Sequence, residues 1–457
     1  MGLQFNKKII LYLLIFFLIV FTRFYNLEKT SRFIWDESSD LVSIHRIWAE
    51  KDITLIGPIS EDGNKVFGSL TYYLLMPFAV INDFSPISTT YGAGFWGIIT
   101  AIVFLILVNK INGEVKFSTA IFIIFWSVLL IPSRWAWNPN FMPFWSALSI
   151  LFLLSKFKYK YFFTGFLLSL TIHHHYLGIY TVLGLGMVLL YESITNRKYM
   201  SIISFGLGSL SAVLPFIAFD LTHLPGLFLT RILYFNYLNN GVNFIQKINY
   251  SNILFLLNLL VIIFFDIKNK SKSLKYIFVF LFSSLLILFT TDFYSHYLLA
   301  GIPFLFVYLI YKRTGVSDFF AKLLVLTITI ISIYKFPNII NKVSWDNDIK
   351  TITNITHSIK NEIFEKKLLN VNLAVLQSPD PNIYGRRYRD LLLIDNIKLL
   401  EKEQYNLTDN LFVLSYKDLT SIREDQAYEI KRFNKGKLVK EWEFEGSQWK
   451  LYLLNRN

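Results

Sequence analysis

The stretch Ile9-Ile-Leu-Tyr-Leu-Leu-Ile-Phe-Phe-Leu-Ile-Val-Phe-Thr22 decides the class of fold. It carries no charge and consists almost entirely of aliphatic and aromatic residues, which is typical of a helix in hydrocarbon. Lys7 and Lys8 precede it, as in a secretory signal peptide. No small-residue cleavage site follows, and many similar segments do, so we interpret it as a retained first membrane helix.

Further apolar blocks follow up to residue 341. The chain of 457 residues is 54% hydrophobic and 18% aromatic, a composition typical of an integral membrane protein. We therefore predict an all-α polytopic membrane domain over residues 1–341, with about 11–12 transmembrane helices, although many blocks are shorter than the roughly 20 residues of an ideal span. The blocks after the first are approximately Leu70–Ile81, Tyr91–Val108, Phe117–Ile131, Phe141–Leu154, Tyr161–Ile172, Tyr176–Tyr191, Ser201–Phe219, Asn252–Phe265, Tyr276–Thr290, His296–Tyr311 and Ala321–Phe336.

The distribution of charge predicts the orientation. One set of loops between the blocks holds 14 Lys and Arg residues and the alternating set only 3, so the first set should be cytoplasmic. The net charge of +13 therefore reflects membrane topology and indicates no nucleic-acid partner. The simplest way to preserve the alternation is that Leu70–Ile81 is a half-helix at the outer surface, which leaves the C-terminus outside. If Leu70–Ile81 crosses the membrane, another block must fail to cross. The basic set is Lys110, Lys116, Lys156, Lys158, Lys160, Arg197, Lys198, Lys268, Lys270, Lys272, Lys275, Lys312, Arg313 and Lys322.

Residues 342–457 have the pattern of a small soluble α/β domain outside the membrane. The stretch Asp348–Phe364 is predicted to be a helix, and Leu368–Gln377 and Leu411–Tyr416 to be strands. Leu438–Phe444 and Trp449–Leu454 are predicted to form a terminal hairpin.

Carboxylates gather in the first outer loop, residues 23–68, where 8 of the 15 acidic residues of the first 344 lie. The loop contains the adjacent pair Asp36-Glu37, followed by Asp40. Charge beside a membrane span is costly and often functional. One member of such a pair can transfer a proton while the other binds or orients. The alternative is a solvated acid pair without a chemical role, and the sequence favours neither strongly.

Cationic and aromatic residues recur on the other outer loops. Arg134 and Asn138 could bind a phosphate, although Trp135 and Trp137 beside them suggest an interfacial segment. A hydrogen-bonding, phosphate-facing or merely capping role is open for His173 and His175, and a phosphate or sugar contact is open for His296 and Tyr297. Arg231 is a second candidate for a phosphate. The run Arg386-Arg387-Tyr388-Arg389 is interpreted as a solvated surface.

No metal or other cofactor is predicted. Neighbouring side chains on a helix diverge by about 100°, so the three histidines 173–175 cannot converge on one ion. The chain has no cysteine, which excludes Cys-ligated metals and disulfides. It also lacks the glycine-rich and nucleophile motifs of nucleotide and serine hydrolases.

The order of several motifs resembles glycosyltransferases of the GT-C type that use polyprenyl-phosphate sugars, a group that includes protein O-mannosyltransferases and the lipid A aminoarabinose transferase. The matching stretches are Phe33-Ile-Trp-Asp-Glu-Ser-Ser-Asp40, Gly57-Pro58, Gly68-Ser-Leu-Thr-Tyr-Tyr-Leu-Leu-Met-Pro-Phe78, Trp137-Asn-Pro-Asn140 and His296-Tyr-Leu-Leu299. The resemblance covers most of the membrane domain. It implies a GT-C-like helical bundle with juxtamembrane helices in the first outer loop.

The resemblance also implies roles. Asp36 takes the position of the general base, with Glu37 beside it, and Asp40 and Tyr72 lie in matching segments that would contact substrate. Relatives carry a basic residue before the Leu-Tyr-Tyr segment. This chain has Phe67-Gly68-Ser69 there, with Lys65 as the candidate replacement. Where relatives have Arg before the late Tyr-Leu-Leu, this chain has His296.

We therefore expect a multi-pass plasma-membrane glycosyltransferase that moves a monosaccharide, with inversion, from a polyprenyl-phosphate lipid to a hydroxyl of an acceptor glycan, lipid or protein. The donor is a substrate, so no cofactor is needed. The alternatives are a transporter or lipid-linked sugar flippase, which the nearly uncharged span interiors disfavour, and a polysaccharide polymerase or ligase.

Overall fold

The computed structural model describes residues 2–59, 66–224, 226–228, 250–290, 294–342, 348–376, 385–434 and 436–456. They form two compact units. The helical unit comprises Met1–Tyr25, Ile53–Leu74 and Gly92–Ile339. The mixed unit comprises Asn26–Asp52, Leu75–Tyr91 and Ile340–Asn457. Most of the first outer loop therefore belongs to the same unit as the C-terminal residues.

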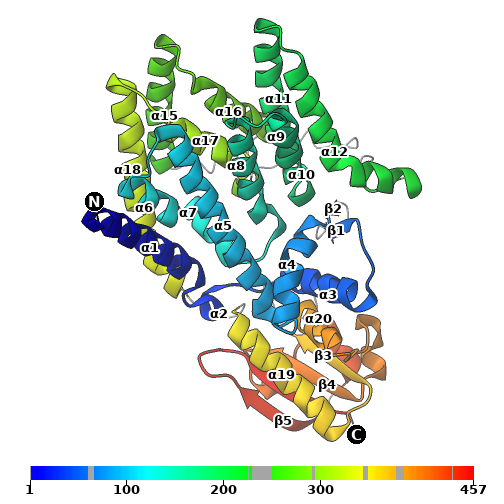
Figure 1. Ribbon diagram of the computed structural model, residues 1–457. Helices are drawn as coiled ribbons and strands as arrows, with labels where there is room; N and C mark the ends of the chain where they lie inside the picture. Colours follow the sequence, from blue (N-terminus) through cyan, green and yellow to red (C-terminus); the bar gives the residue numbers. More distant parts are fainter. Residues whose placement is uncertain are drawn as a thin grey trace. The chain divides into compact units, whose positions relative to one another are not determined.

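The helical unit is built almost entirely from apolar helices (Figure 1). Backbone groups in hydrocarbon need internal partners, and a helix supplies them within one segment. A short antiparallel pair, β1 (Ile56–Ile59) and β2 (Val66–Gly68), belongs to the same unit. The helices are α1 (Gly2–Phe24), α4 (Leu70–Ile81), α5 (Pro86–Asn112), α6 (Phe117–Phe125), α7 (Ser127–Leu130), η1 (Ile131–Arg134), η2 (Asn138–Phe141), α8 (Met142–Leu153), α9 (Lys160–Ser169), α10 (Thr171–His174), α11 (Gly178–Thr195), α12 (Met200–Thr222), α15 (Tyr250–Lys268), α16 (Leu274–Thr290), η3 (Ser295–Leu298), α17 (Ile302–Ile310) and α18 (Gly315–Asn341), of which α4 and α5 begin or end in the mixed unit.

The predicted class, a polytopic helical membrane protein, is confirmed. Among the described residues, α5, α11, α12 and α18 are long and apolar enough to cross a membrane. A fifth span results if Phe117–Phe125 and Ser127–Arg134, which are bent by 52° at their junction, count as one. Helix α4 has 12 residues and is about 18 Å long, which is less than the roughly 30 Å of hydrocarbon. The total of 11–12 spans stays a prediction.

Helices α9 and α12 pack closely against each other. A Cβ atom added to Gly208 would lie 2.0 Å from the backbone oxygen of Phe162, and one added to Gly165 would lie 2.1 Å from the oxygen of Phe205. Glycine on both helices therefore lets the two backbones touch, as is common where membrane helices pack.

A buried ion pair connects the end of α15 to the segment that follows α17. Arg313 Nε lies 2.9 Å from Asp266 Oδ2, and both side chains are 2% exposed. Ser273 and Ser317 donate hydrogen bonds to the same carboxylate, and Arg313 also donates to the backbone oxygens of Leu309 and Tyr311. The pair is thus fully coordinated, which buried charge requires.

The mixed unit contains a four-stranded sheet in the order β3-β4-β6-β5, with β3 and β4 parallel and the other pairs antiparallel. The expected helix, two strands and terminal hairpin are confirmed, with bounds shifted by a few residues. The elements are α2 (Leu27–Thr30), α3 (Trp35–Glu50), α19 (Ile349–Lys366), β3 (Val371–Val375), α20 (Arg386–Ile394), η4 (Lys402–Leu407), β4 (Asn410–Ser415), α21 (Leu419–Arg423), α22 (Tyr428–Phe433), β5 (Lys437–Glu443) and β6 (Lys450–Asn455).

The run Arg386–Arg389 is only in part the solvated surface that the sequence suggested, because Arg386 is exposed but Arg387 and Tyr388 are buried. It forms the first turn of α20, which packs against α3 (Figure 1). Arg387 is 5% exposed. Arg389 donates to the backbone oxygens of Leu373 and Leu400 and to the side chain of Asn372. The burial of these arginines could not be predicted, because a run of charges in the sequence does not show which backbone oxygens accept hydrogen bonds from it in the fold.

The packing of α9 and α12 predicts different outcomes for two glycines of one helix. Gly208→Ala should lower the thermal midpoint of the purified protein in detergent, because overpacking against a backbone atom costs about 1–3 kcal/mol. Gly206 has open space around it, so Gly206→Ala should leave the midpoint unchanged or raise it. Equal midpoints for the two variants would contradict this packing.

Candidate functional site

The acid pair lies in the first turn of α3, in the mixed unit. Asp36 is half-buried, whereas Glu37 is 1% exposed and Asp40 is 7% exposed. Glu37 Oε2 accepts a hydrogen bond of 3.1 Å from the Ile34 backbone N–H. A glutamate at the third helical position commonly caps a helix start in this way. One member of the pair therefore holds the start of α3, and Asp36 is the more accessible acid.

Burial sets the charge state of Glu37. It raises the pKa of this carboxyl to about 8, and Arg32, whose Nε lies 4.0 Å from Oε1, only partly opposes the shift. Oε1 has no hydrogen-bond partner among the residues that the structure describes. A protonated Glu37 suits this environment, because a buried charge with one distant partner is costly.

The side chains of α3 divide into two faces. Successive residues of a helix are about 100° apart, so Asp36, Glu37 and Asp40 share one face. We call this the acidic face. Trp35, Ser38 and Ser39 share the opposite face, which we call the clamp face because it contacts α20.

The contacts of the clamp face are polar. Ser38 Oγ donates to Asp390 Oδ2 at 2.7 Å, and Ser39 Oγ lies 3.3 Å from the same oxygen. Arg386, which pairs with Asp390 at 3.7 Å, lies over the ring of Trp35 at 5.6 Å. Burial raises the pKa of Asp390, while the serine hydroxyls and Arg386 oppose the rise.

Arg134, a predicted phosphate contact, lies elsewhere, in the helical unit, and binds backbone oxygens there. Its Nη1 donates to Thr22 and Arg23 at 2.8 and 3.3 Å, and its Nη2 to Tyr25 at 2.9 Å. Thr22 and Arg23 lie in the last turn of α1 and Tyr25 directly follows the helix, so these are carbonyls of a helix end, which leaves oxygens unpaired and favours a cation. The geometry favours a capping role over contact with a phosphate.

The histidines 173–175 have different partners: His173 and His174 end α10, whereas His175 follows it in extended conformation. His173 Nε2 donates to the Ala212 oxygen at 2.7 Å. His174 Nε2 accepts from Trp145 Nε1 at 2.9 Å, so its Nδ1 carries the proton and donates to Thr71 Oγ1. Asn138 donates to the backbone oxygen of His174. Asn138, His173 and His174 therefore fix α10 within the helical unit.

His175 instead joins a cluster of rings. Its ring centroid lies 4.8 Å from that of Tyr297 and 5.8 Å from that of His296. His296 in turn lies 4.4 Å from Trp137, which stacks on Trp135 at 4.9 Å. The structure thus brings together three of the sequence-predicted candidates: His175, which is buried, and His296 and Tyr297, which are half-buried. Phe67 and Tyr176 complete the ring cluster.

The remaining candidates from the sequence are Tyr72, Lys65 and Arg231. Tyr72 is 5% exposed on α4. Lys65 and Arg231, like Asp292, lie outside the described residues. The sequence analysis missed Ser38, Ser39 and Asp390. The two serines lie within the quoted motif of the first outer loop, but nothing local connects them to an aspartate 352 residues later.

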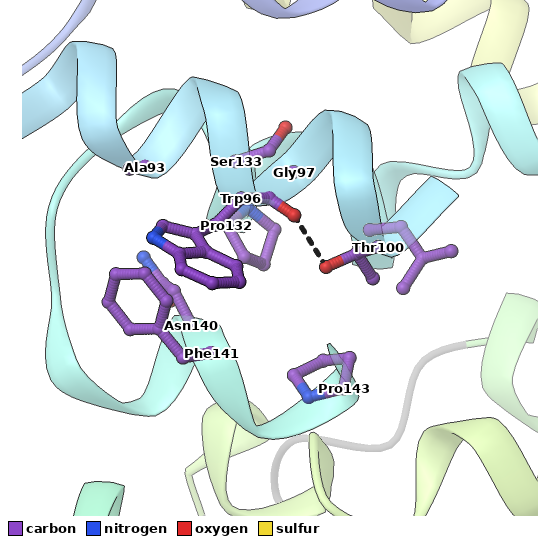
Figure 2. A pocket seen from close by; sticks show the side chains of 10 residues that line it. Ala93, Trp96, Gly97, Thr100, Pro132, Ser133, Asn140, Phe141 and Pro143 are labelled. Carbon is purple, nitrogen blue, oxygen red and sulfur yellow. Dashed lines mark hydrogen bonds between the residues drawn. The ribbon is translucent and has the colours of Figure 1, made fainter. Parts of the chain in front are cut away.

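A small cavity of the helical unit lies between α5, η1 and η2 (Figure 2). Trp96, Gly97, Pro132 and Phe141 are among its lining residues. Its volume of about 10 Å³ fits about one water molecule. It is therefore too small for a sugar or a lipid phosphate.

The burial of Glu37 predicts a pH dependence of stability. An unfolded glutamate titrates near about 4.3, and the folded pKa of Glu37 is about 8. When the pKa of a group is higher in the folded than in the unfolded protein, its contribution to stability is fully present below the unfolded pKa. This contribution is lost as the pH rises to the folded pKa. The thermal midpoint of Glu37→Gln should therefore fall less than that of the wild type between pH 5.5 and 8.5. The exposed Glu50, changed to Gln, is the control and should behave as wild type.

The position of Arg134 predicts an effect in the absence of any ligand. Arg134→Met should lower the thermal midpoint in detergent, because the carbonyls at the end of α1 lose a buried charged donor worth about 1.5–3 kcal/mol per hydrogen bond. Arg197, an exposed residue on the predicted cytoplasmic side, gives the matched control Arg197→Met. An unchanged midpoint combined with weaker donor binding would support a phosphate contact instead.

Comparison with known proteins places the fold. Neither a protein-family model nor a curated protein matches the sequence. Among solved structures, the chain is similar to ArnT from Cupriavidus metallidurans in the apo state, with a TM-score of 0.63 and 8% identity over 98% of both chains. ArnT from the same organism bound to undecaprenyl phosphate gives a TM-score of 0.59 and 7% identity, again over 98% of both chains. ArnT is an aminoarabinose transferase of the GT-C type. At this identity the likeness shows the fold, and the chain has the GT-C fold that the sequence motifs predicted.

Proposed function

We propose that this protein is an integral membrane glycosyltransferase with a polyprenyl-phosphate monosaccharide as donor and a hydroxyl of a glycan, lipid or protein as acceptor. The supporting observation is a likeness along 98% of both chains to a transferase of which one solved structure holds undecaprenyl phosphate. Its active site would lie on the outer face of the plasma membrane, with the C-terminal domain on the same side.

Asp36 is the proposed general base. Its carboxylate takes the proton of the acceptor hydroxyl while the oxygen attacks the anomeric carbon from the face opposite the phosphate. The bond between this carbon and the phosphate oxygen breaks, the lipid phosphate leaves with the electron pair, and the configuration inverts. Asp36 suits the role because it is the most accessible acid of the acidic face, whereas Glu37 is committed to the start of α3.

The departing phosphate needs positive or hydrogen-bonding partners. We retain His296, with His175 and Tyr297 beside it, as the proposed contacts from the described residues. Arg231 and Lys65 stay predictions from the sequence. Arg134 is no longer proposed, because backbone oxygens surround its guanidinium. A lipid phosphate is a good leaving group, so we propose no metal or other cofactor.

The test is transfer of radiolabelled sugar from a panel of synthetic polyprenyl-phosphate donors by purified protein in detergent. Asp36→Asn should lower turnover by about 10²–10⁴-fold, the usual contribution of a general base. Asp52, an exposed acid of the same loop, gives the matched control Asp52→Asn, which should act as wild type. A chelator should leave the rate unchanged.

Near-normal turnover by Asp36→Asn would remove the base assignment. If folded wild type turned over no donor but moved a lipid-linked sugar across vesicle membranes, the flippase alternative would replace the transferase.

A further inference from the structure

The acid-bearing helix α3 is held by a helix from the far end of the chain. The contacts lie on the clamp face: Ser38 and Ser39 bind Asp390, and Trp35 lies against Arg386. Just before the helix, the backbone oxygen of Phe33 lies 3.4 Å from Arg387 Nη1 and accepts its hydrogen bond. These contacts cover the first two turns of α3, and all of them come from the N-terminal half of α20.

Helix α20 is itself fixed to the sheet of the mixed unit. Arg389 Nη2 donates to the backbone oxygen of Leu373 at 2.8 Å and to Asn372 Oδ1 at 2.6 Å. Its Nη1 donates to Leu400 at 2.8 Å. Adjacent residues of one helix therefore contact β3, through Arg389, and α3, through Asp390, so that α20 connects the sheet to the acid pair.

We propose that α20 is a positioning element for Asp36, with Asp390 as its central residue and Ser38 as the group through which it acts. The inference rests on the proposed role of Asp36 as general base. Because the clamp face lies opposite the acidic face, fixing Trp35, Ser38 and Ser39 sets the rotation of α3 about its axis and so the direction of the Asp36 carboxylate. The C-terminal domain then completes the active site without touching the substrate.

The hydrogen bond between Ser38 and Asp390 fixes the geometry of α3 more than it adds to the stability of the protein. Ser38 is fully buried and the Asp390 side chain is 16% exposed, so the charge-assisted hydrogen bond between them is protected from water and is of the stronger kind. Catalytic groups need placement within about 0.5 Å and 10–20°. A displacement of about 1 Å can cost 10²-fold in rate. A helix held only by apolar packing could rotate by more than that.

The experiment compares two aspartates of the same helix region. Asp390→Ala removes the acceptor of the clamp. Asp395→Ala is the matched control, because Asp395 is half-exposed and pairs with Lys360 of α19 at 2.6 Å. We expect Asp390→Ala to lower kcat by about 10- to 100-fold, with KM for the donor and the thermal midpoint close to those of Asp395→Ala.

Two further variants separate positioning from general damage. Asp390→Asn keeps an oxygen acceptor for the Ser38 hydroxyl and should restore most of kcat. Ser38→Ala should lower kcat as Asp390→Ala does, and the double variant should be no worse than either single one, because groups that act as a pair are not additive.

A structural readout keeps this inference distinct from the proposed function. Amide hydrogen exchange of the peptide that contains residues 33–42 should be faster in Asp390→Ala than in wild type and Asp395→Ala. If wild type transfers no sugar, the proposed function fails, while the exchange data still decide whether α20 holds α3. Unchanged exchange in Asp390→Ala overturns the inference, as does equal kcat for Asp390→Ala and Asp395→Ala, or a loss of kcat that merely follows a lower midpoint.

Discussion

A polar group buried among apolar helices must find a partner within the protein, and the helical unit depends on how this constraint is met. Arg134 binds the carbonyls at the end of α1. Asp266 is bound by Arg313 and two serines. His174 uses both ring nitrogens, one for Trp145 and one for Thr71. Each of these contacts joins segments that are distant in the sequence. A buried donor or acceptor that has no hydrogen-bond partner costs about 1–3 kcal/mol or more, so the segments are held where the partners meet. The hydrophobic effect does little to orient helices that are all apolar, so these few polar contacts supply the specificity.

Much of the fold could be predicted because its signals are local. Uncharged apolar blocks indicate membrane helices, and the alternating pattern near the C-terminus indicates the hairpin of β5 and β6. The pairing of α3 with α20 left no such signal. Ser38 and Asp390 are ordinary polar residues in isolation, and their relationship appears only when two distant helices meet. The burial of the arginines of α20 could not be predicted for the same reason. The backbone oxygens of Leu373 and Phe33, which accept their hydrogen bonds, belong to other segments.

The candidate site shows the same division. The first outer loop could be singled out from its acids alone, and the divergence of His173 and His174 follows from helix geometry, whereas the extended backbone of His175 could not be predicted. The different roles of Asp36 and Glu37 could not be predicted, because Ile34 stands at the N-cap position where the capping signature has Ser, Thr, Asp or Asn. The role of Arg134 could not be predicted either, because an arginine between tryptophans looks the same whether it faces a lipid phosphate or the end of another helix. The type of a residue predicts which interactions its side chain can make. Only the neighbours in the fold decide whether those interactions are already made within the protein.

The distance along the chain between Ser38 and Asp390, 352 residues, also has a consequence for biogenesis. At a synthesis rate of about 5–20 residues per second, about 20–70 s separate the two residues on the ribosome. Helix α3 emerges early and has to wait for its partner until almost the whole chain has been made. Contacts of such long range form late in folding. A chain that stalls before residue 390 keeps its hydrophobic segments but lacks the acceptor of Ser38 and Ser39, so a contact of α3 depends on a residue made when 390 of 457 residues are complete.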